Sequence, residues 1–282
     1  MADTGSLFKP QAYVERVRAL APGLRFREDV YGVVDEVPLL ALTREALDPE
    51  RDHQPIEPRA TVYLAAGLHG DEPAGPLAIL RLMTERWFPT DVAWHILPMM
   101  NPSGLGRGTR ENGQGVDINR DYTAFTTYEA AQHRAWLETH APGRDTDNPD
   151  GYTLSLLLHE DWEANGFYCY EVRDLERNRP SVAPAILGAA GPICGIDPGD
   201  IIDERIAKDG LIAPLEFEPE LDFSDLPGLP EALFLYQHHS SLNYTLETPS
   251  AQYLETRVRC QAEAVKAAVA TLLEHLPSPG DA

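Results

Sequence analysis

Residues 61–68 place the strongest constraint on the fold, because they form a nearly continuous apolar segment without a charged side chain. A strand with one face in water alternates polar and apolar residues, whereas a strand buried on both faces has a sequence like this one. The letters HGDE follow at residues 69–72, and Pro73 suits the first turn of a helix that we expect to reach about Trp87. A buried strand that turns sharply into a helix is therefore the first predicted unit.

The rest of the chain continues this alternation of strands and helices. We expect a mostly parallel sheet covered by helices on both faces, and ligands bind beyond the carboxyl ends of the strands in such a sheet. Proline and acidic residues dominate residues 191–230, which predicts irregular surface structure there. Two further strands are predicted within 24–43, turning near Tyr31-Gly32, and others at 92–99, 154–158, 232–236 and 244–247. Helices are predicted at 11–20, 73–87, 127–140 and 252–276. Loops are predicted at 51–59, 104–122 and 142–151.

Charge and composition exclude several classes of function. Asp and Glu (45) exceed Lys and Arg (23), so the formal net charge is −22. Binding to nucleic acid or to an anionic membrane surface depends on clustered cations, so we expect neither partner. The 282 residues, 43% of them hydrophobic, suit one large α/β domain. We expect a single domain over 1–282, in which an N-terminal helix and hairpin (1–58) pack on a core of residues 61–276.

The cysteines and the N-terminus bear on the cellular compartment. Cys169, Cys194 and Cys260 show no CxxC spacing, so neither a disulfide framework nor a thiolate metal site is indicated. The N-terminus lacks an apolar run of signal-peptide length, and no segment approaches the roughly 18 apolar residues of a membrane span. From these features we expect a cytoplasmic protein.

Four polar side chains stand at the ends of predicted strands: His69 and Glu72, then His159, then Glu247. Two imidazoles and one carboxylate are the protein ligands of a catalytic zinc ion, which keeps one position open for water. Each residue alone has an alternative interpretation. An HxxE spacing also suits a helix-capping His beside a solvated Glu, a lone His159 suits a core histidine, and Glu247 could pair with an Arg. Gly70 in a sharp turn after a buried strand favours the zinc site.

The segment 104–122 concentrates positive charge in a chain that has little of it. Arginine forks bind carboxylates in bidentate fashion and polarise carbonyl oxygens, and asparagine adds neutral donors. The alternative is a solvated loop whose arginines pair with nearby acids. The residues concerned are Arg107, Arg110, Asn112, Asn119 and Arg120.

Together these motifs resemble the zinc metallocarboxypeptidase family, of which carboxypeptidase A is the familiar member. The resemblance extends from about residue 61 to residue 249, and the order and local contexts of the motifs carry it. The matching positions are His69 and Glu72 in HxxE, Arg110, Asn119 and Arg120 in GVDINRDY, His159 after a strand, and Glu247 in TLETP.

This resemblance implies a fold, a cofactor and a role for each residue. The fold would be a single three-layer α/β/α domain around a mixed, mostly parallel sheet. His69, Glu72 and His159 would bind one Zn²⁺, and Glu247 would be the general base. Arg110 would stabilise the oxyanion, while Asn119 and Arg120 would hold the terminal carboxylate of the substrate.

The chain also departs from the digestive members of that family. Those enzymes place a mobile tyrosine well before the catalytic Glu, whereas Tyr236 and Tyr244 lie closer to Glu247 and neither is assigned a role. The specificity loop is therefore expected to be short. The motif HGDEPAG and the compact length also resemble bacterial peptidoglycan-peptide amidases and, more distantly, the succinylglutamate desuccinylase/aspartoacylase group, which cleaves N-acyl amino acids.

Three functional hypotheses follow. The first is a zinc hydrolase that cleaves an amide next to a free carboxylate in a short or modified peptide. The second is an N-acyl-amino-acid deacylase, and the third is a binding module that lost catalysis. Asp71 and Glu160 are the carboxylates available for a second metal, although no spacing requires one, and His238-His239 is a further candidate for the cleft wall.

Overall fold

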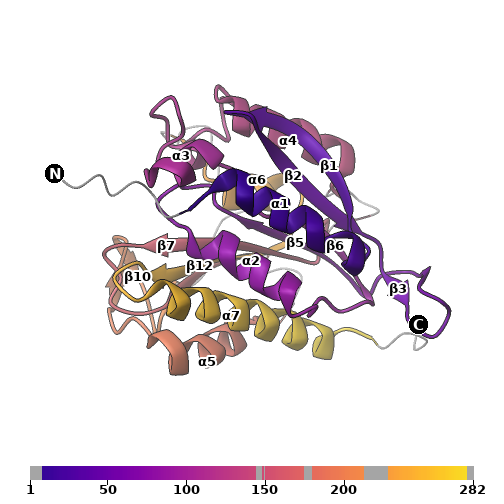
Figure 1. The fold of residues 1–282 in the computed structure, drawn as a ribbon. Coiled ribbons are helices and arrows are strands. Elements are labelled where there is room, and N and C mark those ends of the chain that lie inside the picture. The colour runs from indigo at the N-terminus through magenta and orange to yellow at the C-terminus, as the bar shows by residue number, and fades with distance from the viewer. Residues whose placement is uncertain (1–7, 144–147, 149, 175–179, 213–227, 278–282) are drawn as a thin grey trace.

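The computed structural model describes residues 8–143, 148, 150–174, 180–212 and 228–277 (Figure 1). Its helices are α1 (Pro10–Leu20), α2 (Ala74–Thr84), α3 (Pro102–Arg107), α4 (Tyr128–His140), α5 (Ala183–Cys194), α6 (Glu231–His238) and α7 (Leu254–His275), with 3-10 turns at Pro22–Leu24 and Ile118–Arg120. Its strands are β1 (Arg27–Val34), β2 (Val37–Arg44), β3 (Leu47–Asp48), β4 (Gln54–Pro55), β5 (Ala60–Ala66), β6 (Val92–Leu97), β7 (Leu154–Asp161), β8 (Tyr168–Arg173), β9 (Ile201–Ile202), β10 (Arg205–Ile206), β11 (Leu211–Ile212) and β12 (Leu242–Pro249).

Eight of these strands form one sheet in the order β1-β2-β6-β5-β7-β12-β8-β11. The central strands β6, β5, β7 and β12 pair in parallel. Antiparallel pairs occur between β1 and β2, between β2 and β6, and between β12 and β8, whereas β11 pairs with β8 in parallel. The prediction of a mixed, mostly parallel sheet is therefore confirmed.

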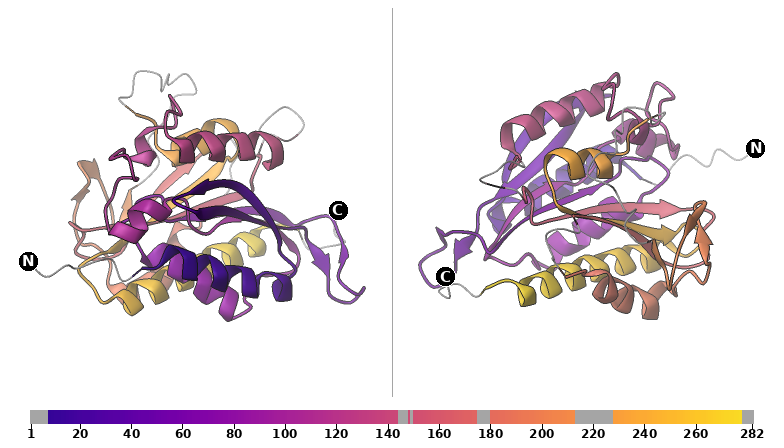
Figure 2. Two further views of the ribbon diagram at one scale, coloured as in Figure 1. Left: turned by 45° about the horizontal axis from the view of Figure 1, so that its top comes forward. Right: turned by 180° about the vertical axis from the view of Figure 1, so that it is seen from behind.

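Helices cover both faces of this sheet (Figures 1 and 2). Side chains of α1, α2, α5 and α7 share one hydrophobic cluster, and side chains of α4 and α6 belong to a second. Strand β5 contributes to both clusters, because Val62 and Leu64 face the first cluster while Tyr63 and Ala65 face the second. This alternation explains why residues 62–66 are all hydrophobic, because each face of the strand meets a hydrophobic cluster.

Several predicted boundaries are wrong. The first hairpin turns at Asp35 and Glu36, which have φ of 47° and 64°, and the irregularity near Gly32 is a bulge in β1. The expected strand at 232–236 is helix α6, which follows Pro230 and packs Phe234 against the sheet. A short apolar run fits a strand or a buried helix equally well, so the spacing of its apolar residues could not distinguish the two.

The region between 160 and 230 contains more regular structure than expected. Strand β8 and helix α5 were not predicted, and α5 reaches into the segment 191–230, which also contains β9, β10 and β11. The remainder of that segment, residues 213–227, and part of the loop expected at 142–151 lie outside the described residues.

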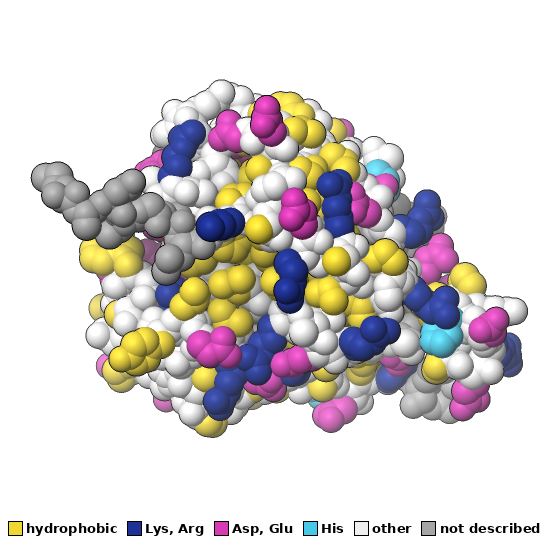
Figure 3. Space-filling model, in the orientation of Figure 1, with side chains coloured by type: hydrophobic (Ala, Val, Ile, Leu, Met, Phe, Trp, Pro, Cys, Tyr) yellow, Lys and Arg dark blue, Asp and Glu magenta, His cyan; other side chains and the backbone are white. Residues whose placement is uncertain are grey.

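Across the face shown in Figure 3, basic and acidic side chains are interspersed. Ion pairs in the described structure include Arg18 with Glu28 and Arg81 with Glu85. Within the described residues, no helix combines the length and apolar character needed to cross a membrane.

A buried polar network fastens α4 and α6 to the sheet. The Tyr63 hydroxyl donates to Glu231 Oε1 at 2.7 Å and lies 3.0 Å from His133 Nε2, while the Tyr122 hydroxyl lies 2.7 Å from His133 Nδ1. Because the Tyr63 proton is used on Glu231, the network is satisfied when Nε2–H donates to Tyr63 and Nδ1 accepts from Tyr122. A neutral imidazole therefore fits, and burial lowers the pKa of His133 to about 3.

This network predicts a pH dependence of stability. The folded pKa of His133 is about 3, whereas histidine in an unfolded chain titrates near 6.5. Between these values the unfolded chain binds the additional proton, so His133 makes stability fall as pH decreases through this window. We expect His133→Gln to reduce the slope of unfolding free energy against pH by up to about 1.4 kcal/mol per pH unit. Urea titrations of both proteins between pH 7 and pH 4.5 measure this difference, and parallel slopes would contradict it.

Candidate metal centre

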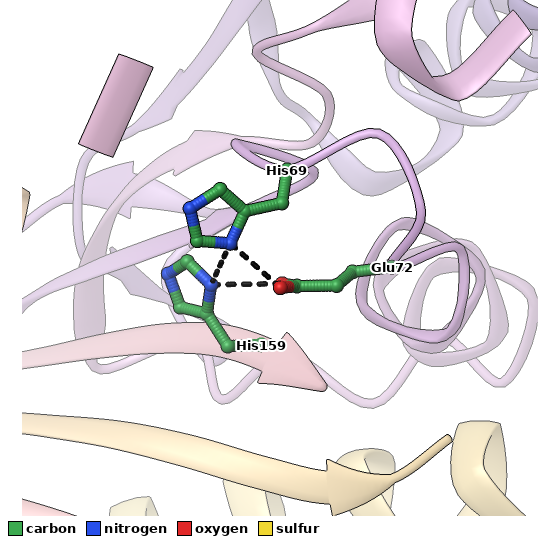
Figure 4. A group of neighbouring side chains, drawn as sticks. All are labelled: His69, Glu72 and His159. Atoms are coloured by element: carbon green, nitrogen blue, oxygen red, sulfur yellow. Dashed lines mark hydrogen bonds and ion pairs between the residues drawn. The ribbon is translucent and has the colours of Figure 1, made fainter. Parts of the chain in front are cut away.

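The three predicted metal ligands come together at one end of the sheet (Figure 4). His69 lies in the turn after β5, Glu72 lies just before α2, and His159 lies within β7. The turn requires a glycine at position 70, since a Cβ there would be 2.0 Å from the backbone carbon of Gly104. Gly70 N also donates to Arg110 O at 3.2 Å, which brings the arginine-containing loop beside His69.

Nitrogen and oxygen donor atoms of these residues point at one another. His69 Nδ1 lies 2.6 Å from Glu72 Oε1, His159 Nδ1 lies 2.8 Å from Glu72 Oε2, and the two Nδ1 atoms are 3.2 Å apart. All three side chains are buried. Buried lone pairs that converge in this way require a proton or a cation between them. Two imidazoles and a carboxylate are a donor set that zinc accepts, so the residues fit a zinc ion.

Asp117, which was not among the residues selected from the sequence, orients the first of these histidines. His69 Nε2 lies 3.2 Å from Asp117 Oδ1, so the ring donates to the carboxylate there and turns Nδ1 toward Glu72. Burial alone would lower the pKa of His69, but Glu72 and Asp117 outweigh it and raise the pKa to about 9. Burial likewise opposes ionisation of Glu72, yet the two histidines hold its pKa well below the ordinary value.

Arg110 lies against the same group. Its Nη1 atom is 3.3 Å from His69 Nδ1 and 3.7 Å from Glu72 Oε1, and its Nε donates to Asp117 Oδ2 at 3.0 Å. Burial would lower the pKa of Arg110, but Asp117 and Glu72 raise it. The guanidinium therefore stays charged and is held at the edge of the cluster by Asp117.

Glu247 is opposite His159 in the parallel ladder between β12 and β7. It lines the same cavity as the three clustered residues. Burial raises its pKa well above the ordinary value, and the nearby His159 opposes that rise. On its other side Glu247 is paired in register with Tyr168 of β8. Tyr168 lines the cavity and donates to Asp161 Oδ2 at 3.0 Å. It was not among the residues selected from the sequence, because β8 was not predicted.

Asn119 and Arg120 are also in the cavity wall. Asn119 Oδ1 accepts from Glu231 N at 2.9 Å, at the start of α6, so its amide nitrogen is the group left to face a ligand. The exposed Arg120 donates from Nη1 to the carbonyl oxygen of Asn119 at 3.0 Å. Of the loop residues singled out, Asn112 lies elsewhere and donates to Glu129 Oε2 at 3.2 Å. Arg107 donates to Gly113 O at 3.3 Å.

The cavity has a volume of about 670 Å³ and extends from the clustered residues to Tyr170, Trp162 and Ile201. The tyrosines considered from the sequence are not in its wall. Tyr244 is buried on the opposite face, where its hydroxyl accepts from Val182 N at 2.9 Å, and Tyr236 belongs to α6. The pair His238-His239 ends α6 and does not line the cavity either.

No second metal group accompanies His69, Glu72 and His159 among the described residues. Of the two carboxylates considered for a second ion, Asp71 is exposed. Glu160 is buried and is occupied by Arg257 and by Ala74 N.

Part of the chain is similar in sequence to known proteins. Residues 58–141 match the family model of the succinylglutamate desuccinylase/aspartoacylase catalytic domain. Murein peptide amidase A of Escherichia coli K12 is 29% identical over 117 residues, which cover 37% of this chain and 46% of the amidase. Carboxypeptidase SOL1 of Arabidopsis thaliana is 32% identical over 78 residues, 24% of this chain and 16% of that protein. The matched region thus spans less than half of either curated relative.

Solved structures match over nearly the whole chain. A candidate metallopeptidase from Shewanella denitrificans superposes with a TM-score of 0.73 at 23% identity, covering 93% of this chain and 90% of that one. A metallo-carboxypeptidase from Burkholderia cenocepacia superposes with a TM-score of 0.64 at 18% identity, covering 95% and 70% of the two chains. The chain therefore has the metallocarboxypeptidase fold, as the resemblance of its sequence predicted, and carries within it a segment similar to the succinylglutamate desuccinylase/aspartoacylase catalytic domain.

Proposed function

We propose that this chain is a zinc-dependent hydrolase that cleaves an amide bond next to a free carboxylate, acting as a metallocarboxypeptidase on short or modified peptides. The observation that carries the proposal is the convergence of His69, Glu72 and His159, with Glu247 opposite His159 in the same cavity. His159 lies 90 positions after His69 in the chain, yet its Nδ1 atom converges with that of His69 and with the Glu72 carboxylate on one buried point.

In this proposal His69, Glu72 and His159 hold one Zn²⁺. Zinc bound by such residues lowers the pKa of water toward ~7 and polarises a carbonyl oxygen. Asp117 keeps His69 in the tautomer whose Nδ1 is free to bind, and the carbonyl oxygen of His159 accepts from Gln261 Nε2 at 2.7 Å, which fixes the strand at that residue.

Glu247 is the proposed general base. In this role its carboxylate removes a proton from the attacking water and returns it to the leaving amine. Arg110 lies at the edge of the metal group with its charge intact, where it stabilises the negative charge that develops on the carbonyl oxygen.

Asn119 and Arg120 are the proposed anchor for the free carboxylate of the substrate. The amide nitrogen of Asn119 and the guanidinium of Arg120 offer donors from adjacent positions in one wall of the cavity. An anchored carboxylate fixes the distance between the substrate terminus and the bond that is cleaved, and so converts binding into orientation.

An N-acyl-amino-acid deacylase is the second candidate. The observation that favours it is the match of residues 58–141 to the succinylglutamate desuccinylase/aspartoacylase catalytic domain, because this segment includes His69, Glu72, Arg110, Asn119 and Arg120. The two candidates share a mechanism and differ in what lies on the acyl side of the amide. A binding module without catalysis is the remaining alternative.

We also propose a reducing, cytoplasmic location. Cys169, Cys194 and Cys260 are free and buried, which suits a compartment in which thiols stay reduced.

Metal content tests the ligand assignment. His69→Ala and His159→Ala each remove one of three protein ligands, so we expect either variant to lose zinc that the wild-type protein retains through gel filtration. His238→Ala, which changes a histidine outside the cavity, serves as the control and should keep the wild-type zinc content. Plasma emission spectrometry gives the stoichiometry, and near-stoichiometric zinc in either site variant would show that the ligand assignment is wrong.

The base role of Glu247 has its own test. Glu247→Gln preserves the size of the side chain but removes the proton acceptor, so we expect kcat to fall by about 10²-fold or more with zinc content unchanged. Steady-state kinetics on any cleaved substrate measure the effect. Wild-type turnover in this variant would disprove the base assignment, and an inactive wild-type protein would favour the binding module.

A substrate panel separates the two enzymatic candidates. Zinc-loaded protein is incubated with short peptides that have free or amidated C-termini and with several N-acyl amino acids, and products are identified by mass spectrometry. The carboxypeptidase proposal predicts loss of the C-terminal residue from free-acid peptides only, because the amide cannot pair with Arg120. Cleavage confined to the N-acyl amino acids would establish the deacylase instead.

A further inference from the structure

Glu160 is a buried carboxylate whose partners come from three other elements, α2, β12 and α7. It follows His159 in β7, and its side chain is buried, with the residue 5% exposed. Its Oε1 atom accepts from Ala74 N at 2.8 Å, and its Oε2 atom accepts from Thr248 Oγ1 at 3.4 Å and forms a close ion pair with Arg257. Both carboxylate oxygens are therefore occupied by groups of this chain.

The partners of Glu160 belong to the segments that carry the proposed site. Ala74 is the first residue of α2, two positions after Glu72. Thr248 follows Glu247 in β12 and is the register partner of Glu160 in β7. One carboxylate thus joins the segments of Glu72, His159 and Glu247, and its position at the start of α2 is favourable because a helix N-terminus attracts negative charge.

Helix α7 completes this arrangement with two side chains four residues apart. Arg257 pairs with Glu160, while Gln261 Nε2 donates to His159 O at 2.7 Å and to Thr248 Oγ1 at 2.9 Å. Residues at i and i+4 lie on the same face of a helix, so α7 holds the ends of β7 and β12 with one face. Gln261 is fully buried.

We propose that Glu160 is a positioning residue that sets the spacing of the metal ligands and of the general base. It does so by fastening the start of α2 and the ends of β7 and β12 to one another. The inference rests on the metal centre proposed above. It also gives Glu160 a role different from that of a second metal ligand.

Two substitutions distinguish the effect of the length of the Glu160 side chain from the effect of its charge. Glu160→Gln keeps the length of the side chain but presents an NH₂ group either to Ala74 N or to Arg257. At that position two hydrogen-bond donors then face each other, and one hydrogen bond is lost. Glu160→Asp keeps the charge but is one methylene shorter, so it cannot reach Ala74 and Arg257 together. If Glu160 acts by position, both variants should bind Zn²⁺ about 10–100-fold more weakly than the wild-type protein, as is usual when a residue that orients ligands is removed.

The measurement is competitive titration of metal-free protein with Zn²⁺, together with the visible absorption spectrum of the Co²⁺-substituted protein. The spectrum reports ligand geometry and should change in both variants. Glu129→Gln is the matched control, because Glu129 is also 5% exposed and hydrogen-bonded but lies on α4, which carries none of the proposed ligands. It should lower the melting temperature without altering Zn²⁺ affinity or the Co²⁺ spectrum.

Thr248→Val is a milder variant that keeps the experiment informative if the Glu160 variants do not fold. It removes the hydroxyl group between Glu160 and Gln261, and a smaller loss of Zn²⁺ affinity in the same direction is expected. Wild-type affinity and spectrum in the folded variants would overturn the proposal. So would a Glu160→Asp protein that binds normally while Glu160→Gln does not, since charge alone would then explain the effect. A wild-type protein that binds neither metal would overturn the metal centre and this inference together.

Discussion

The parallel register of β5, β7 and β12 is the constraint on which the site depends. Parallel strands end at the same edge of a sheet, and here Ala66 is paired with Leu158 while Glu247 is paired with His159. A shift of one residue would turn every side chain of a strand to the opposite face, so the two hydrophobic clusters on either side hold this register firmly. The hydrophobic core therefore determines where the polar residues at the strand ends are placed.

Three acidic side chains around the site are each paired with basic groups, and these pairs join different elements. Glu72 is paired with His69 and His159, Asp117 lies between His69 and Arg110, and Glu160 is paired with Arg257. Removing one partner of a buried pair commonly costs about 3–5 kcal/mol, because the other charge is left without compensation. The same contacts that orient the ligands thus also join the elements that carry them.

Much of the fold could be predicted from local pattern, and much of the rest depends on distant contacts. The strand at 61–68 has a continuous apolar run, the helix after Pro73 follows a turn signal, and the C-terminal helix is amphipathic; the structure contains all three. The sequence ALFLY at 232–236 was assigned to a strand because five apolar residues carry no usable period, and only its packing against the sheet makes it part of α6. Tyr168 was overlooked because β8 was not predicted, although the run FYCYEV at 167–172 follows Asn165-Gly166 and is rich in residues that favour strands.

For the site, the sequence by itself determined which chemical groups are available and in what order: an HxxE turn, an Arg- and Asn-rich loop, a strand-end His and a late Glu. Only the tertiary structure decided which of them meet. His69 and His159 are 90 positions apart, and their contact exists because β5 and β7 are neighbours in the sheet. The contacts from which roles are proposed for Asp117 and Glu160 were likewise decided in three dimensions, because a carboxylate acquires its function from the donors that surround it. Those donors come from elements that no local pattern connects.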